Sequence, residues 1–158
     1  MASPAPLLRR TFASPVGPLL AELNAAGALT SLGRARVEVP GRPVVHPTFT
    51  QLGDELARYF AGEAVRFAVP TAPEGSDFRQ QVWAELKRLE WGRMITYSEL
   101  ADRLGSNARA VGQANGANPV AIVIPCHRVV GKDGSLVGYA GGLDMKRTLL
   151  RLERCILF

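Results

Sequence analysis

The pattern of apolar residues changes at residues 70–75, and this change constrains the fold more than any other feature of the sequence. The segment holds two prolines and one glycine within six residues, which is typical of a linker. Short apolar runs and turns come before it, and longer runs with helical spacing come after it. The sequence therefore predicts an α+β protein, in which a small sheet-bearing N-terminal domain (residues 1–75) packs on a helical C-terminal domain (residues 76–158).

The N-terminal part has the pattern of three short strands and one helix. Apolar runs at residues 7–13, 19–23 and 28–32 are separated by turn-forming proline and glycine residues, which predicts a small antiparallel sheet with a structural role. Residues 34–47 are rich in proline and arginine and predict an irregular connection. A helix is expected over residues 48–61, because its apolar side chains share one face.

The C-terminal part has the pattern of several helices. Ser76 or Asp77 is expected to cap the first of them, and Ser98 to cap a second that runs through Leu104. After a glycine turn, a third helix is expected over residues 108–116. Two short helices around a glycine turn are a candidate helix-turn-helix, although helical hairpins of this length often contribute only to a core.

The charge of the chain leans toward basic residues, mainly in the C-terminal part. The formal net charge is +5, and the residues before Ser76 include 7 basic and 6 acidic side chains, against 12 and 8 from Ser76 onward. This surplus suits a polyanionic partner. It favours nucleic acid only slightly, because arginine is also a common solubility device.

No stretch of the sequence is long and apolar enough for a membrane span, so no membrane partner is expected. The first ten residues lack the apolar core of a signal peptide, and Cys126 and Cys155 make no disulfide framework. We therefore expect a cytoplasmic protein. His46 and His127 are the two histidines, and no spacing predicts a metal site.

The octapeptide Val-Ile-Pro-Cys-His-Arg-Val-Val, residues 123–130, places a nucleophile beside an imidazole. A cysteine attacks as its thiolate, so a reactive cysteine needs a base or a positive charge nearby. His127 and Arg128 are candidates for both roles. By itself the motif is ambiguous, because a buried cysteine next to a histidine is often only core and neighbouring strand residues point to opposite faces.

Further motifs surround this octapeptide in a specific order. These motifs are Phe78-Arg79-Gln80-Gln81-Val82-Trp83, Thr96-Tyr97-Ser98-Glu99-Leu100-Ala101, Ala108-Arg109-Ala110-Val111-Gly112-Gln113-Ala114-Asn115, Asn118-Pro119, Gly138-Tyr139-Ala140-Gly141-Gly142-Leu143, Lys146, Leu149-Leu150 and Glu153. In this order and spacing they resemble the O6-alkylguanine-DNA alkyltransferase family over about residues 76–153, half of the chain.

The resemblance implies DNA repair by direct and irreversible transfer of an alkyl group from O6 of guanine to Cys126, without a cofactor and once per molecule. It gives His127 and Glu153 an activating role, in which the histidine polarises the thiol through water and the carboxylate orients the imidazole. Tyr97 would donate its hydroxyl to N3 of the leaving guanine, and Asn118 would brace the helix-turn-helix against the cysteine segment. Some family members carry a structural zinc, which is not expected here.

The resemblance also implies how DNA is held. The small residues Ala108, Ala110 and Gly112 suit a helix that lies against the minor groove of double-stranded DNA. Arg109 would insert into the base stack in place of the flipped O6-alkylguanine. The residues implied to bind this base are Tyr139, which would stack on it, Ala140, whose loop offers free amide groups, and Val129. A monomer is expected, and cooperative assembly on DNA is left open.

Two other functions remain open from the sequence. A non-repairing binder of alkylated DNA could recruit other repair proteins, but such relatives of the family lack the cysteine. A hydrolase using Cys126 and His127 would turn over many times. The sequence also departs from the family pattern, because the turn at residues 105–108 is two residues shorter and Leu89-Glu90-Trp91-Gly92 replaces a common Ile-Pro-Tyr-Gly. If the relay operates, the pKa of Cys126 should lie below its ordinary value.

Overall fold

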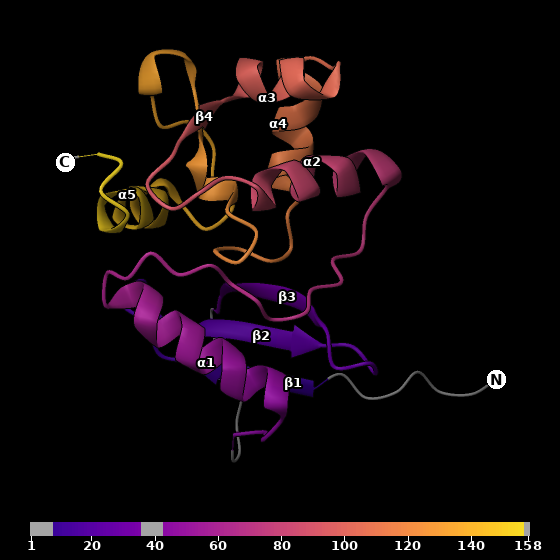
Figure 1. Ribbon diagram of the computed structural model, residues 1–158, viewed down its shortest axis with the longest axis vertical. Helices are drawn as coiled ribbons and strands as arrows, with labels where there is room; N and C mark the ends of the chain where they lie inside the picture. Colours follow the sequence, from indigo (N-terminus) through magenta and orange to yellow (C-terminus); the bar gives the residue numbers. More distant parts are fainter. Residues whose placement is uncertain (1–7, 36–42, 157–158) are drawn as a thin grey trace.

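The computed structural model describes residues 8–35 and 43–156. A three-stranded sheet and one long helix form one part of the molecule, and a group of shorter helices forms the other (Figure 1). Mixed α and β structure agrees with the α+β prediction. In chain order the described elements are β1 (Leu8–Phe12), β2 (Leu19–Leu23), β3 (Leu29–Arg34), α1 (Pro47–Phe60), α2 (Asp77–Lys87), β4 (Ile95–Thr96), α3 (Tyr97–Leu104), α4 (Ala108–Gly116), η1 (Cys126–Arg128), β5 (Val129–Val130), η2 (Lys132–Gly134) and α5 (Leu143–Leu152).

The sheet is antiparallel in the order β1-β2-β3, with β2 in the centre. Alternate residues of β2 are buried (Leu19, Ala21 and Leu23), because successive side chains of a strand point to opposite faces. Helix α1 packs on this face, with Phe49 and Leu52 fully buried. The predicted strands are confirmed to within two residues at their ends, apart from residue 7, which lies outside the described residues.

The predicted helix over residues 48–61 is confirmed with a shift of one residue. It begins at Pro47 because His46 caps it, where Nδ1 accepts the Thr48 backbone N–H at 3.0 Å. The predicted irregular connection lies partly outside the described residues, which exclude 36–42, and its first residue, Arg34, ends β3.

Helix α2 begins as predicted after Ser76, whose hydroxyl accepts the backbone N–H of Arg79. The prediction that Ser98 caps the next helix is wrong. Thr96 is the cap, since its hydroxyl accepts the Glu99 backbone N–H at 3.1 Å and donates to the Glu99 carboxylate at 3.0 Å. Thr-x-x-Glu is the sequence signature of a capping box, but here the Glu99 carboxylate accepts the Thr96 hydroxyl and not the Thr96 backbone N–H.

The shortened turn between α3 and α4 forms a complete helix-turn-helix. Gly105 ends α3 in the left-handed conformation with φ of 61°, which glycine adopts without strain. Asn107 then caps α4, and its side-chain oxygen accepts the Ala110 backbone N–H at 2.9 Å. The helix therefore begins at Ala108 as predicted. Its inner side is held by Trp83 of α2, whose indole N–H donates to the Ala114 carbonyl at 2.8 Å.

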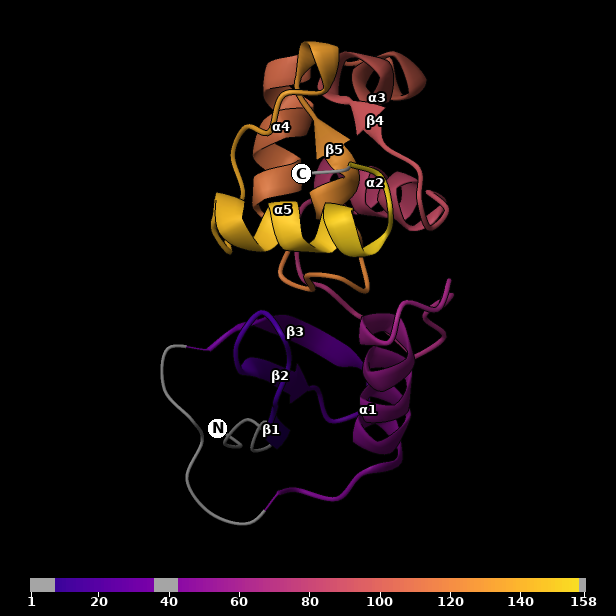
Figure 2. The ribbon, with the colours of Figure 1, turned by 90° about the vertical axis from the view of Figure 1, so that its left-hand side faces the viewer.

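The two parts are joined by backbone hydrogen bonds from β3. On one side Leu29 pairs with the linker, through its N–H to the Pro70 carbonyl. On the other side Leu32 pairs with the segment that leads to the cysteine, through its N–H to the Pro119 carbonyl and its carbonyl to the Ala121 N–H, both at 2.9 Å. Figure 2 shows α5 on the side of the helical part that faces the sheet. The division at residues 75 and 76 stays a prediction.

Within residues 8–35 and 43–156, none of the helices has the length and apolar character needed to cross a membrane.

Candidate active site

Cys126 lines a cavity of about 560 Å³, which lies where the two parts of the molecule meet. The cysteine begins the short 3-10 turn η1, directly after Pro125. A turn, and not a strand, therefore carries the Cys-His pair, so the two neighbours need not point to opposite faces of a sheet. The cavity is lined by residues of β3, α3, α4, the cysteine segment and the loop before α5: Leu32, Gly33, Arg34, Ala35, Tyr97, Gly112, Asn115, Gly116, Asn118, Pro119, Ala121, Cys126, Gly138, Tyr139, Ala140, Gly141 and Met145.

His127 lies behind the cavity and does not line it. Its side chain is fully buried, and Nε2 forms a short hydrogen bond to the Glu153 carboxylate. Its other ring nitrogen, Nδ1, is buried and has no hydrogen-bond partner among the described residues. A buried polar atom without a partner is costly, so Nδ1 is suited to receive a hydrogen bond from a further group such as water.

Glu153 is the centre of the network that holds His127. It follows the last residue of α5, and its side chain is fully buried. Its carboxylate accepts hydrogen bonds from the Tyr59 hydroxyl at 2.6 Å and from Arg128 Nε at 2.7 Å, besides the imidazole. The backbone N–H of Gly92 contributes a longer bond of 3.4 Å. Glu153 is therefore part of the buried network and not a solvated surface residue.

Burial is the largest influence on the protonation state of the imidazole, and the charges of the network modify it. Burial alone would raise the pKa of Glu153, but His127 and Arg128 outweigh it and lower the pKa to about 2. Burial lowers the pKa of His127, although Glu153 opposes this. A neutral imidazole therefore donates Nε2–H to a carboxylate, which leaves the lone pair on Nδ1. His127 can act as a base through Nδ1.

The thiol departs from the expectation that its pKa is lowered. Burial raises the pKa of Cys126, and the opposing effects of Asn118 and Lys146 are smaller. The thiol is therefore neutral in the free protein at neutral pH. A neutral thiol has to pass its proton to a base before or during any attack by its sulfur, and the lone pair of His127 Nδ1 is available for this proton.

Two asparagines hold the segment around the cysteine. Asn118 donates to the Ile124 carbonyl at 2.8 Å and accepts the Val120 N–H at 3.0 Å. Asn115, at the end of α4, donates to the Cys126 carbonyl at 3.3 Å. Within this segment Ile122 has a φ of 71°, a conformation that is strained for a β-branched residue. The asparagines thus hold a strained backbone next to the nucleophile.

The loop before α5 is held by hydrogen bonds from the side chains of Lys146 and Tyr97. Lys146 is fully buried, and Nζ donates to the carbonyls of Val137 at 3.0 Å and Gly138 at 3.3 Å. The Tyr97 hydroxyl donates to the same Val137 carbonyl at 3.2 Å. Burial lowers the pKa of Lys146 to about 8, although Cys126 opposes this shift. Next in the loop, Tyr139 has a buried hydroxyl without a hydrogen bond of ordinary geometry, and burial beside Cys126 raises its pKa.

The predicted substrate-binding residues are divided between the cavity and the core. Tyr139 and Ala140 line the cavity. Val129 is fully buried in β5, where it pairs with Ile95 of β4, and its side chain does not line the cavity. A contact between Val129 and the base stays a prediction, and it would have to come from the backbone.

Three of the four predicted DNA-binding residues lie on the outer side of α4. Ala108, Arg109 and Gly112 line an open hollow together with Tyr97. Gly112 and Tyr97 also line the cavity, so the helix surface leads to the cysteine. Ala110 is half-buried and lines neither the hollow nor the cavity.

Three residues of the site received no role in the sequence analysis: Tyr59, Asn115 and Lys146. Asn115 and Lys146 occurred there only within the motifs of the resemblance. The partner of Asn115 lies 11 positions away and that of Tyr59 lies 94 positions away, so no local pattern could assign these two residues. Both cysteines are free thiols, and the described residues bring together no group of three His, Cys, Asp or Glu side chains that could hold a metal ion.

Comparisons with known proteins agree on one family of methyltransferases. A model of the family described as 6-O-methylguanine DNA methyltransferase, DNA binding domain, matches residues 77–155. A methylated-DNA–protein-cysteine methyltransferase of Methanosarcina acetivorans is 44% identical over 148 residues, which make up 90% of this chain and 95% of the relative. The Mycobacterium tuberculosis protein of the same name is 44% identical over 151 residues, 92% of this chain and 91% of the relative.

Solved structures agree with these relatives. The crystal structure of an O6-methylguanine methyltransferase of Mycobacterium tuberculosis aligns with a TM-score of 0.83 at 40% identity, and covers 94% of this chain and 93% of the other. A crystal structure of OGT from that organism in complex with DNA aligns with a TM-score of 0.81 at 43% identity, and covers 92% of each chain.

Proposed function

The chain belongs to the methylated-DNA–protein-cysteine methyltransferase family, and from this premise we propose that it repairs O6-alkylguanine in double-stranded DNA by transferring the alkyl group to Cys126. The observation that carries the proposal is the position of Cys126, which opens into a cavity while a buried His127–Glu153 pair lies behind it.

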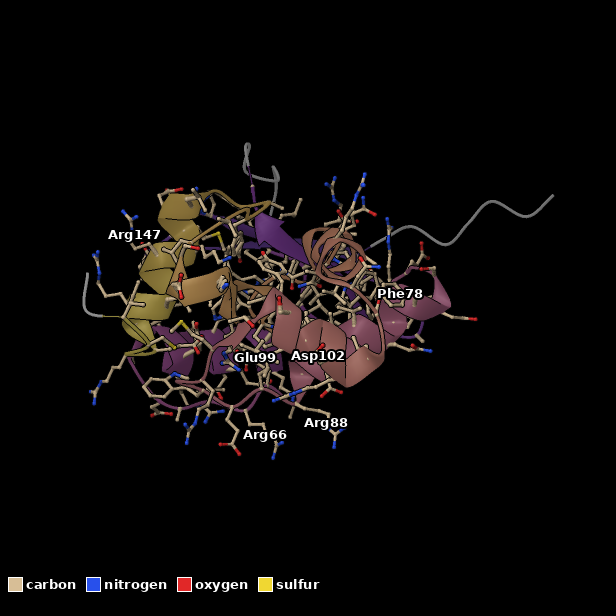
Figure 3. The ribbon with its side chains drawn as sticks, turned by 90° about the horizontal axis from the view of Figure 1, so that it is seen from above. Arg66, Phe78, Arg88, Glu99, Asp102 and Arg147 are labelled. Carbon is tan, nitrogen blue, oxygen red and sulfur yellow. The ribbon has the colours of Figure 1, made fainter. Side chains whose placement is uncertain are left out.

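DNA is held on the outer side of α4. In Figure 3, which looks down on the helical part, α3 carries Glu99 and Asp102, both of which are exposed. Carboxylates repel phosphates, whereas Arg109 on α4 is an exposed cation with no ion pair among the described residues. Helix α4 lies in the minor groove, and Arg109 fills the place of the flipped base.

The flipped guanine occupies the cavity. Tyr139 stacks on the base, the amide groups near Ala140 face O6, and the Val129 backbone contacts the base edge. The Tyr97 hydroxyl exchanges its bond to the Val137 carbonyl for one to N3 of the guanine. Alkylation weakens base pairing, so the damaged base costs less to flip than intact guanine, which gives selectivity without reading the sequence.

The transfer is a displacement at the alkyl carbon. The Cys126 sulfur forms a bond to that carbon, while the bond between the carbon and O6 breaks. The thiol proton passes through a bridging water to His127 Nδ1, and Glu153 stabilises the imidazolium that forms. The Tyr97 hydroxyl donates a hydrogen bond to N3 and so stabilises the electron pair that the broken bond leaves on the guanine. The guanine then takes up a proton from water and the imidazolium releases one, so no net proton is gained or lost. The thioether product is stable, so each molecule acts once and needs no cofactor.

The remaining assignments follow from this activity. Residues 76–158 form the DNA-binding and alkyl-acceptor domain, and residues 1–75 form a supporting domain. The protein acts as a monomer in the cytoplasm, where its DNA substrate is accessible.

The test uses duplex DNA that carries O6-methylguanine with a labelled methyl group. Label should appear on Cys126, mapped by peptide mass spectrometry, at no more than one equivalent per molecule. Cys126→Ala should abolish transfer and retain DNA binding, whereas the matched variant Cys155→Ala should transfer normally. Turnover well beyond one equivalent would identify a hydrolase, and binding without label on wild-type protein would identify a non-repairing binder.

A further inference from the structure

Among the described residues of the N-terminal part, Arg34 is the cation that lines the cavity. It ends β3 and lies outside residues 77–155, the region that the family model matches. The four residues at the end of β3, Leu32 to Ala35, line the cavity beside Cys126. The N-terminal part is therefore a wall of the active site as well as a support for it.

The guanidinium of Arg34 holds three separate segments at once. Its Nε donates to the Val16 carbonyl at 2.9 Å, which fixes the side chain on its own domain. One terminal nitrogen donates to the Gly141 carbonyl at 3.0 Å, in the loop that carries Tyr139. The other approaches the Asp144 carboxylate at 3.2 Å, at the start of α5. A planar fork suits such multiple acceptors, and lysine could not replace it.

The loop of residues 138–142, which accepts the Arg34 hydrogen bond at Gly141, is closely packed. Gly142 has a φ of 99°, a conformation that only glycine adopts readily. A Cβ atom on Gly141 would lie 2.7 Å from Met145 Sδ and 3.1 Å from the Tyr139 ring, so the loop packs closely against the base-binding tyrosine. Arg34 also lowers the pKa of Asp144 through their hydrogen bond. Displacement of Gly141 would therefore displace Tyr139.

We propose that Arg34 is a positioning residue for the alkyl transfer, which clamps the loop of residues 138–142 from the N-terminal domain and thereby sets the width of the cavity for the alkylated base. This proposal rests on the proposed function and adds to it a role for the N-terminal domain in catalysis. The salt bridge to Asp144 is partly exposed and contributes little to stability by itself, with side-chain exposures of 32% and 75%. Its effect is on geometry, since a shift of about 1 Å in a reacting group can slow a reaction by about a hundredfold.

The first measurement does not depend on activity. Hydrogen–deuterium exchange of the amides of residues 138–142 should be faster in Arg34→Ala than in the wild type. Arg9→Ala is the matched control, because Arg9 pairs with Glu22 inside the same sheet and does not line the cavity. Its loop exchange should equal that of the wild type. Equal exchange in Arg34→Ala and Arg9→Ala would overturn the clamp.

The second measurement compares two substrates. Arg34→Ala and Asp144→Ala should each slow the saturating transfer rate by about tenfold, for free O6-benzylguanine and for O6-methylguanine in a duplex alike. The half-saturating DNA concentration should change by less than about twofold, and the double variant should be no slower than either single one. Reaction of Cys126 with iodoacetamide should stay unchanged.

The outcomes separate the two proposals. A loss confined to the duplex, with a raised half-saturating concentration, would make Arg34 a phosphate contact and overturn the clamp. Wild-type rates in Arg34→Ala would overturn it as well. Failure of wild-type protein to transfer any alkyl group would contradict the proposed function, whereas the exchange measurement would still decide whether Arg34 holds the loop.

Discussion

At the scale of single residues, the site combines a neutral thiol with a neutral base. Burial raises the pKa of Cys126 and lowers that of His127, so the pair stores no charge before substrate arrives. A thiolate exposed in the free protein would react with any electrophile. A thiol that loses its proton only during the transfer is protected, and the buried His127 Nδ1, which has no partner among the described residues, is the acceptor that we propose for that proton.

This protonation state predicts how the rate of reaction between Cys126 and a small electrophile depends on pH. In a Cys155→Ala background, alkylation of Cys126 by iodoacetamide should keep accelerating above pH 8.5, about the ordinary pKa of cysteine, because burial favours the neutral thiol. A raised folded pKa adds stability that is present below the unfolded pKa and is lost as pH rises through the folded one. The alkylation rate at each pH is measured by quenching the reaction at several times and quantifying the modified Cys126 by mass spectrometry. A plateau reached below about pH 8 would show a preformed thiolate and contradict the prediction.

At the scale of elements, side-chain caps set where the two helices of the helix-turn-helix begin. The start of α3 is fixed by the Thr96 cap, and that of α4 by the Asn107 cap. Arg109 is the second residue of α4, so the cap places it. Because Tyr97 and Gly112 line both the outer hollow and the cavity, a base that leaves the duplex at α4 has a short way to Cys126.

Arg109→Ala is expected to slow repair of O6-methylguanine in a duplex by about tenfold or more, because the flipped state loses the side chain that fills the stack. Reaction with free O6-benzylguanine should change by less than about twofold, since no flipping is needed. Single-turnover rates on both substrates measure this. Arg103→Ala provides the control, because Arg103 lies on α3 and pairs with Glu85. If the rates on both substrates fell equally, Arg109 would contribute to folding or to the shape of the cavity and not to base flipping.

At the scale of the whole molecule, one buried carboxylate joins the two parts. Glu153 bonds to Tyr59 of α1, to Arg128 and His127 of η1, and to the backbone of Gly92. Its pKa of about 2 lies below the ordinary value of 4.5. Such a group adds stability above its unfolded pKa, and this contribution is lost as pH falls through the folded one.

Acid should therefore destabilise the protein through Glu153. The free energy of unfolding should fall by about 3 kcal/mol between pH 4.5 and pH 2 from this group, and Glu153→Gln should lack that component. Urea unfolding at several pH values measures both curves, which should converge as pH falls. Asp144→Asn is the control, because its exposed carboxyl also has a lowered pKa but no buried partner. Parallel curves for wild type and Glu153→Gln would contradict the assignment.

The sequence by itself determined the local elements and the identity of the nucleophile. Strand alternation, helix caps and turn glycines act over a few residues, and they predicted α1, α2 and α4 closely because these signals are local. The motif around Cys126 indicated the type of chemistry, but only the tertiary structure determined the surroundings of the reacting groups. It buried Glu153 against Tyr59, raised the pKa of Cys126 instead of lowering it, and brought Arg34 to the cavity from 107 residues before Gly141. Burial and long-range contacts depend on how distant segments pack, and no local pattern contains them.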